Sequence, residues 1–354
     1  MKQQDIDSVW IELYSRWKEF TLTEMGTLKR GKSKHRPRYA FHLYGGPYPF
    51  IQTGQIREAS KYITKYEQTY SEAGLAQSKL WNKDTLCITI AANIAEIAIL
   101  SFDACFPDSV LGFIPDKNKC DLNFVFYTLK YFQKELQQMG DGSVQDNINL
   151  GTFEQIKFPF PPLPEQTAIA SILSSLDDKI DLLHRQNKTL EQLAETLFRQ
   201  WFLPVRGTQT GVEEAEESWE VEALDYVASF HNGKSRPNEI GKIPIYGGNG
   251  ILGYTNVFNY SGKSIIVGRV GAYCGSLYFE NNEIWVSDNA LLVKAKNENQ
   301  IHYLFYLLKN LELNSMAQGS SHPLLTQTLL KSIEITKHPK SRVLIFKLSN
   351  GTIK

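Results

Sequence analysis

The sequence lacks the cysteine and histidine spacings that hold structural metals. Its four cysteines, Cys87, Cys105, Cys120 and Cys274, form no Cys-x-x-Cys pair, and no histidine spacing completes a zinc site. Scattered single cysteines are typical of reduced, buried thiols in a cytoplasmic protein. We therefore expect no metal site.

Long hydrophobic runs are also lacking. The first seven residues are polar and acidic, without the apolar segment of a signal peptide. Residues 86–102 are apolar overall, but Asn93 and Glu96 interrupt them, so they do not form a bilayer span. These absences favour a cytoplasmic location with no membrane partner.

An excess of charge of one sign is lacking, since 38 Lys and Arg residues balance 38 Asp and Glu residues. This balance argues against a protein that binds nucleic acid by bulk electrostatics alone. It leaves room for local basic patches, and one cluster lies within ten residues: Lys29, Arg30, Lys32, Lys34, Arg36 and Arg38.

Signatures of catalysis are absent too. The sequence contains no Asn/Asp-Pro-Pro-Tyr/Phe tetrapeptide, no Gly-x-Ser-x-Gly and no His-Glu-x-x-His. Residues 26–33 match the P-loop pattern literally, but the flanking sequence predicts neither a buried strand before them nor a helix after them. We interpret this segment as a turn that presents a lysine, and we expect no catalytic site.

What the sequence does contain is an internal repeat. Landmarks near Asp108 and Phe126 recur near Asp288 and Phe305, at offsets of 177 to 180 residues, so the first copy has about two dozen extra residues. Three earlier landmarks recur at one offset of 202 residues: Trp17 with Trp219, Gly31-Lys32-Ser33 with Gly233-Lys234-Ser235, and Tyr44-Gly45-Gly46 with Tyr246-Gly247-Gly248.

Each copy alternates short β-rich stretches with glycine and asparagine. Examples of such stretches are 86–90, 265–267 and 284–286. Each copy also contains one helical stretch, 123–138 in the first and 301–313 in the second. The pattern predicts an α+β fold with two similar modules, each made of short strands plus helices.

The segment between the modules predicts one long helix. Residues 158–164 contain four prolines and favour an extended strap. Residues 165–203 contain no Pro or Gly and would form a coiled-coil-type rod of roughly 58 Å, unless they form a core helix of one larger domain. Asn187 interrupts the apolar heptad positions Ile169, Leu173, Leu176, Ile180, Leu183, Leu190, Ala194, Leu197 and Trp201.

The residues at the end of the strap and the start of the predicted helix resemble a known family. Pro161-Pro162-Leu163-Pro164-Glu165-Gln166, followed by Ile169-Ala170, Leu176-Asp177 and Ile180, resembles the central region of type I restriction-modification specificity subunits. The order of module, strap, helix and module is also similar, from Trp17 to about Pro339.

The resemblance implies a non-catalytic subunit that recognises a bipartite, asymmetric double-stranded DNA target. It also implies that the helix is a platform for two modification (methyltransferase) subunits, which a restriction (motor-nuclease) subunit joins. S-adenosylmethionine, ATP and Mg are then expected only on those partners. The implied domains are 1–160 and 219–339 for target recognition, 161–204 for the strap and helix, 205–218 for a linker and 340–354 for a divergent tail.

The sequence departs from the family after Pro339. Where the first copy continues as Leu163-Pro164-Glu165-Gln166, the second continues as Lys340-Ser341-Arg342-Val343, so the family's second conserved helix is not expected. We interpret this as a truncation. The long helix would then self-associate, borrow a helix from another half-subunit, or leave the chain inactive.

The motifs and the resemblance together predict which residues contact DNA and which contact other subunits. The amides of Gln145 and Asn147 suit adenine, and arginine and lysine suit phosphates or guanine. The predicted DNA contacts are Lys29, Arg30, Lys32, Lys34, Arg36, Arg38, Tyr44, Ser143, Gln145, Asn147, Lys234, Arg236, Tyr246, Ser320 and Ser321. The predicted subunit contacts are Glu165, Gln166, Leu173, Leu176, Ile180, Leu183, Asn187, Leu190 and Leu197.

The sequence is also compatible with structural explanations of these motifs and with other functions of the chain. The basic run could be a solvated loop, and the Tyr-Gly-Gly segments could be purely structural turns. The whole chain could instead be a coiled-coil adaptor whose duplicated modules bind protein or glycan, or an inactive remnant.

Overall fold

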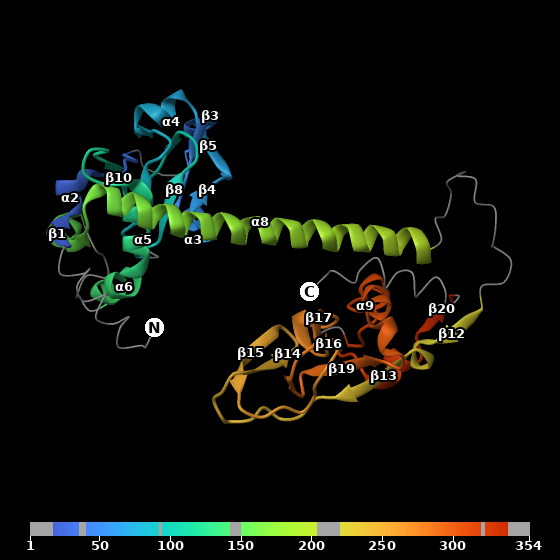
Figure 1. Cartoon of the computed structure of the whole chain (residues 1–354). Coiled ribbons are helices and arrows are strands. Elements are labelled where there is room, and N and C mark those ends of the chain that lie inside the picture. Colours follow the sequence, from blue (N-terminus) through green and yellow to red (C-terminus); the bar gives the residue numbers. More distant parts are fainter. Residues whose placement is uncertain are drawn as a thin grey trace, which may run out of the picture. The chain divides into compact units, whose positions relative to one another are not determined.

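The computed structural model describes residues 17–34, 40–91, 94–141, 150–203, 220–319 and 323–338 (Figure 1). The chain forms two compact units, Met1–Asp181 and Leu182–Lys354. The division falls inside the long helix α8 (Leu163–Phe202), so each unit includes one part of this helix. The two units are described separately.

Unit 1 is built on a five-stranded sheet. Apolar residues face both sides of its central strands, which are wholly buried. One face packs against α5 (Leu122–Tyr131) through Phe124 and Val125. The strand order is β2 (Gly26–Arg30), β10 (Val110–Pro115), β7 (Leu86–Thr89), β8 (Ile97–Leu100) and β4 (Tyr62–Ile63).

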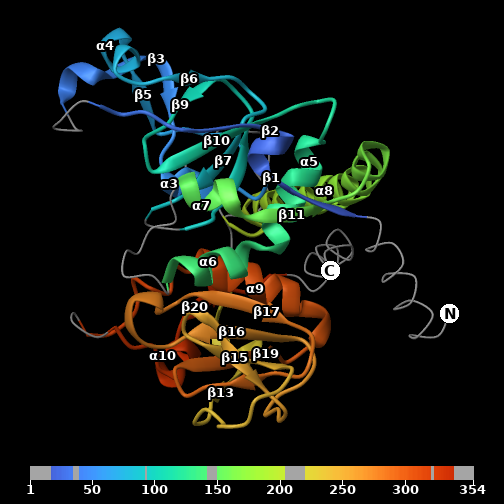
Figure 2. The same ribbon diagram turned by 90° about the vertical axis from the view of Figure 1, so that its left-hand side faces the viewer.

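A smaller sheet extends from one end of unit 1, away from β1 (Lys18–Thr21) (Figures 1 and 2). Stacked aromatic rings form much of its core: Phe50 lies 4.1 Å from Tyr70, and Trp81 lies 4.7 Å from Phe106, between ring centroids. The strand order is β5 (Gln68–Tyr70), β3 (Tyr44–Phe50), β9 (Ala104–Cys105) and β6 (Leu80–Trp81).

Short elements complete unit 1. The strand β1 pairs with β11 (Lys157–Phe160), directly before α8. The predicted helix over 123–138 is broken at Phe132 into α5 and a second helix. The remaining helices are α2 (Leu22–Met25), η1 (Phe41–Leu43), α3 (Thr53–Glu58), α4 (Glu72–Ala76), α6 (Gln133–Asp141) and α7 (Leu150–Gln155).

Unit 2 repeats this plan with fewer strands. Its main sheet has the order β13 (Ala228–Asn232), β19 (Ala290–Ala295), β16 (Ser264–Gly268) and β17 (Leu277–Glu280). Its smaller sheet has the order β15 (Gly250–Thr255), β14 (Ile243–Gly247) and β18 (Trp285–Val286). The pair β12 (Val221–Ala223) and β20 (Glu334–Thr336) corresponds to β1 and β11.

In the described part of unit 2 beyond α8, one helix has ten residues and the others are short. The predicted helix over 301–313 is observed as α9 (Ile301–Asn310), which packs against the main sheet. The others are η2 (Leu224–Tyr226), η3 (Gly271–Tyr273), η4 (Glu298–Gln300) and α10 (Gln327–Lys331).

The pairing registers confirm the internal repeat. In unit 1, Leu111 of β10 lies opposite Arg30 of β2; in unit 2, Leu291 of β19 lies opposite Asn232 of β13. These positions differ by the offsets read from the sequence, 180 and 202. The first strand pair also matches, since Thr21 faces Lys157 as Ala223 faces Glu334. The two units are therefore copies of one α+β module.

The Tyr-Gly-Gly landmark, in contrast, is not equivalent in space. The parallel pair of the smaller sheet joins Phe50 to Cys105 in unit 1 and Ile245 to Trp285 in unit 2. Cys105 and Trp285 differ by 180 residues, but Phe50 and Ile245 differ by 195 rather than 202. The register of β3 shifts between Tyr44 and Tyr48, which accounts for part of the difference.

The long helix forms as predicted, with a shift at its start. It begins at Leu163 rather than Glu165, with Pro164 in the first turn, where a missing N–H leaves no helical hydrogen bond unmade. None of the described helices combines the length and apolarity needed to cross a bilayer. All four cysteines are free and buried, and burial raises the pKa of the Cys105 thiol to about 11.

Candidate nucleic-acid interface

The Gly-Lys-Ser segments adopt equivalent positions in the two modules. The Gly31 N–H donates to the carbonyl of Val110, at the edge of the main sheet, and that of Gly233 donates to Ala290. Each glycine lies directly against the backbone of the loop that precedes the neighbouring strand, β10 in unit 1 and β19 in unit 2. A Cβ on Gly31 would lie 2.2 Å from the Pro107 oxygen, and one on Gly233 would lie 1.8 Å from the Ser287 oxygen. Both positions therefore require glycine, because the backbone of the neighbouring loop comes too close for a side chain. The residues before Gly31 form the strand β2 rather than a phosphate-binding loop.

The basic residues of the first module emerge from this segment. Lys29, Arg30 and Lys34 are exposed, and Lys32 is half-buried. The Arg30 guanidinium donates to the carbonyl of Asp108. The backbone of Lys32 is held by the Ser78 hydroxyl, which donates to its carbonyl at 2.7 Å. The four cations thus lie on a fixed part of the module surface.

A cation that the sequence pattern did not indicate joins this group. The Lys79 ammonium lies 3.5 Å from the centroid of the Trp81 ring. Burial lowers the pKa of Lys79, and the nearby charge of Lys29 lowers it further. Lys79 is separated from the basic run by about forty-five residues. The hydrogen bond from Ser78 to Lys32 and the pairing of β6 with β9 bring it to this surface.

The second module presents fewer cations at the same place. Lys234 and Arg236 are exposed, and the Lys234 N–H donates to the Val286 carbonyl at 3.0 Å. Tyr246 is buried, and its hydroxyl donates to Glu280 at 2.6 Å. The Tyr246 side chain is therefore used in the packing of its own module.

Tyr44 also serves the module's own packing. It lies half-buried against Tyr70, with ring centroids 5.2 Å apart. The other predicted DNA contacts lie outside the described residues: Arg36, Arg38, Ser143, Gln145, Asn147, Ser320 and Ser321.

At the start of α8, the predicted subunit contacts Glu165 and Gln166 are used within unit 1. Glu165 accepts a hydrogen bond from the Trp17 indole at 3.1 Å. Gln166 is buried, donates to the carbonyls of Pro161 and Lys119, and accepts from the Asp121 N–H. The proline-Glu-Gln motif therefore fastens the helix to the first module, because each polar atom of Gln166 finds a backbone partner there.

A buried lysine strengthens the same junction. The Lys61 ammonium donates to the hydroxyls of Ser174 on α8 and Tyr127 on α5, at 2.8 and 3.1 Å. Tyr127 in turn donates to the Asp177 carboxylate at 2.5 Å. Burial lowers the pKa of Lys61, and the charges of Asp177 and its neighbours oppose that shift. This network holds α5 and α8 together through charged hydrogen bonds.

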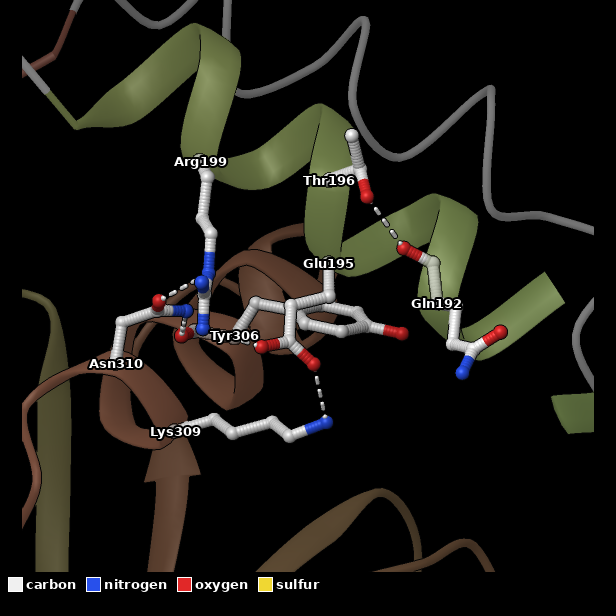
Figure 3. A network of polar contacts seen from close by, with 7 residues as sticks. All are labelled: Gln192, Glu195, Thr196, Arg199, Tyr306, Lys309 and Asn310. Atoms are coloured by element: carbon white, nitrogen blue, oxygen red, sulfur yellow. Dashed lines mark hydrogen bonds and ion pairs between the residues drawn. The ribbon is translucent and has the colours of Figure 1, made fainter. Parts of the chain in front are cut away.

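The last turns of α8 pack on the second module. Ala194, Phe198 and Phe202 are buried in its main core, and the Leu197 side chain packs against that core. Figure 3 shows the polar edge of this contact: Glu195 accepts from Lys309 at 2.8 Å and from Arg199 at 2.7 Å. The hydrogen bond from Lys309 is the main cause that lowers the pKa of Glu195.

Between these two ends, α8 carries an exposed apolar face. Leu173 is half-buried, whereas the following heptad positions are exposed, as is Asn187. We call this set the exposed helix face: Leu176, Ile180, Leu183 and Leu190. Exposed apolar residues at regular helical spacing are typical of a surface that another chain covers.

A family model described as type I restriction modification DNA specificity domain matches residues 14–192 and 216–339, which together are most of the chain. This chain belongs to that family. The family membership confirms the resemblance seen in the sequence, and it confirms the expectation of a specificity subunit rather than a catalytic one. It argues against the coiled-coil adaptor.

Individual relatives agree with the family. The chain is 24% identical over 328 residues to the type I restriction enzyme EcoprrI specificity subunit of Escherichia coli, covering 89% of this chain and 82% of that protein. It is 30% identical over 206 residues to the MjaVIII specificity subunit of Methanocaldococcus jannaschii, covering 53% of this chain and 44% of that protein.

A solved structure shares the fold. The crystal structure of the type I restriction-modification S subunit from M. genitalium matches with a TM-score of 0.61 at 19% identity, covering 95% of this chain and 88% of that one. The specificity-subunit fold, two sheet-rich modules joined through a long helix, is thereby confirmed. Among the described residues, no group of three or more His, Cys, Asp or Glu side chains is placed to hold a metal ion.

Proposed function

We propose that this specificity subunit recognises a bipartite, asymmetric double-stranded DNA target, with each module reading one half. The observation that carries the proposal is the matched strand register of the two modules, which gives each a Gly-Lys-Ser segment at the same sheet edge. Two copies of one scaffold with different surface residues suit two different half-sites on one duplex.

The basic residues around these segments would supply the first contacts. Lys29, Lys32, Lys34 and Lys79 in the first module, with Lys234 and Arg236 in the second, would bind phosphates or the O6 and N7 edge of guanine. Phosphate contacts position a protein on the duplex, and the loops beyond them would read bases.

The exposed helix face would serve assembly. Its apolar residues are not used by either module, so they are available to two modification subunits and, through them, to a restriction subunit. S-adenosylmethionine, ATP and Mg would be bound by those partners, and the complex would act in the cytoplasm. Self-association of this chain through the same face is the second candidate, because a heptad face can pair with a copy of itself.

The test of DNA recognition begins with mobility shifts of random-sequence duplexes at rising salt. We expect binding that weakens steeply with salt, as counterion release requires. Mapping of methylated bases in cells that express this chain with adjacent modification subunits should then reveal a split motif that depends on the chain. Absence of duplex binding and of the motif would leave the inactive-remnant alternative.

The test of assembly uses the exposed helix face. The substitutions Leu176→Glu and Leu183→Glu should abolish co-purification with the modification subunits but leave the unfolding midpoint of the chain unchanged. Sedimentation of the wild-type chain alone distinguishes the second candidate, since self-association predicts a dimer that these substitutions dissociate. A monomeric wild type that still forms the larger complex argues for partner binding alone.

A further inference from the structure

Two large apolar side chains stand out for their exposure. Phe41 is 95% exposed and Ile240 is 89% exposed, more than any other large apolar residue in the part of the chain that the structure describes. A single exposed apolar residue is common on protein surfaces. What distinguishes this pair is its position, since each residue lies shortly before the first strand of the smaller sheet of its module.

Each residue stands at the entry to the smaller sheet of its module. Phe41 lies three residues before β3, and Ile240 lies three residues before β14. These two strands correspond, since each pairs in parallel with the strand that precedes the Asp108 or Asp288 landmark. Each residue also follows the Gly-Lys-Ser segment of its module by ten residues or fewer.

In the first module, α4 holds the basic segment and Phe41 together. At its start, the Ser71 hydroxyl donates to the His42 carbonyl at 2.7 Å, and the Ser71 N–H donates to Leu43, which is buried. Just past its end, the Ser78 hydroxyl donates to the Lys32 carbonyl. Ser71 and Ser78 are seven residues apart and are separated mostly by helix, so these two anchors lie roughly 10 Å apart.

In the second module, β15 has the same role. The Arg236 guanidinium lies against Gly253, where an added Cβ would be 2.6 Å from a guanidinium nitrogen. Three residues further along, just past the end of β15, the Asn256 side chain donates to the Ile240 carbonyl at 3.0 Å. The Gly241 N–H donates to the carbonyl of Tyr254 on β15. A cation and an apolar tip are thus both held by β15 and the residue that follows it.

We propose that Phe41 and Ile240 are base-contacting tips: each enters a groove of the duplex beside the basic segment and contacts base edges or base faces. The inference rests on the proposed function. A phenyl or sec-butyl side chain has no donor for a phosphate, and the apolar surfaces that DNA offers are thymine methyl groups and base faces. The adjacent cations would bind the flanking phosphates and bring each tip to the groove.

The experiment selects duplexes from a library with a randomised interior, using the full chain. The wild type should enrich a split motif. Phe41→Ala should lose base preference in one half of that motif, and Ile240→Ala in the other half. The matched controls are Tyr131→Ala and Tyr226→Ala, exposed aromatic residues of the same two modules outside the basic segments, which should enrich the wild-type motif.

The magnitude and salt dependence separate a base contact from a phosphate contact. Each tip variant should lower the preference for the selected duplex over a scrambled one about tenfold. The slope of affinity against salt should stay unchanged for Phe41→Ala, because no charge is removed, whereas Lys34→Ala should reduce it by about one. Circular dichroism and thermal unfolding of all variants should match the wild type.

Two outcomes would overturn the inference in different ways. If both tip variants enrich the wild-type motif with undiminished preference, the tips do not contact bases, and their exposure belongs to a protein-facing surface. If the wild type itself enriches no motif, the proposed DNA recognition fails and the base contact fails with it.

Discussion

The side-chain amide of Gln166 donates to the carbonyl oxygen of Pro161 at 2.8 Å and thereby fixes the first turn of α8 to the strap that precedes it. The same amide group donates to Lys119, and its oxygen accepts from Asp121. One buried glutamine therefore joins the strap, the helix and the segment before α5. The proline-Glu-Gln motif therefore attaches the helix to its own module.

Replacement of this glutamine should destabilise unit 1. In Gln166→Glu, a buried carboxylate would face two carbonyl oxygens, so we expect a loss of at least about 2–3 kcal/mol in the free energy of unfolding. The control is Gln192→Glu, an exposed position on the same helix, with an expected change within about 0.5 kcal/mol. Denaturant unfolding measures both, and equal effects would contradict the fastening role.

The landmark glycines should not tolerate alanine. Gly31→Ala and Gly233→Ala would each place a methyl group against a backbone oxygen, so we expect losses of about 1–3 kcal/mol or more. Gly54→Ala is the matched control, because nothing lies within 4 Å of the added Cβ there. Its stability should be unchanged or raised by up to about 1 kcal/mol. A stable Gly31→Ala variant would refute the close approach.

The buried lysine network should depend on one hydroxyl group. Tyr127→Phe removes the oxygen that joins Lys61 to Asp177, and we expect a loss of about 1–3 kcal/mol, since the bonds involve charged groups. Tyr131→Phe, at an exposed position on the same helix, should have no measurable effect. Thermal unfolding of the two variants gives the comparison; similar midpoints would show that the network adds nothing.

The ion pair of Glu195 and Lys309 should couple α8 to α9 in a pH-dependent way. The pKa of Glu195 is lowered from its ordinary value of 4.5, so the coupling is fully present above that value. It should be lost as pH falls through the lowered pKa of the folded state. A double-mutant cycle with Glu195→Gln and Lys309→Met should give about 0.5–1 kcal/mol at neutral pH, because both groups are partly exposed.

The pH series supplies the control for this cycle. In acid below the folded-state pKa of Glu195, the coupling energy from the same four proteins should approach zero. A coupling energy that stays constant through this range would assign the contact to packing rather than charge.

Local sequence patterns could predict those elements that are stabilised mainly by interactions between residues close in sequence. The helix over 163–202 could be predicted because its residues lack Pro and Gly and repeat apolar positions at helical spacing. The break at Phe132 could not be predicted, since no proline or glycine marks it, and Phe132 packs against Phe158, which is distant in sequence.

The sequence by itself determined that the chain contains one module twice and a long helix between the copies, because identity at constant offset and apolar periodicity are properties of the chain alone. Only the tertiary structure decided which landmarks are equivalent and which side chains remain on the surface. A register shift in β3 separates Tyr44 from Tyr246, sheet pairing brings Lys79 to the basic segment, and the backbone anchors of α4 and β15 leave Phe41 and Ile240 exposed. Burial and proximity depend on long-range pairing, which no local pattern encodes.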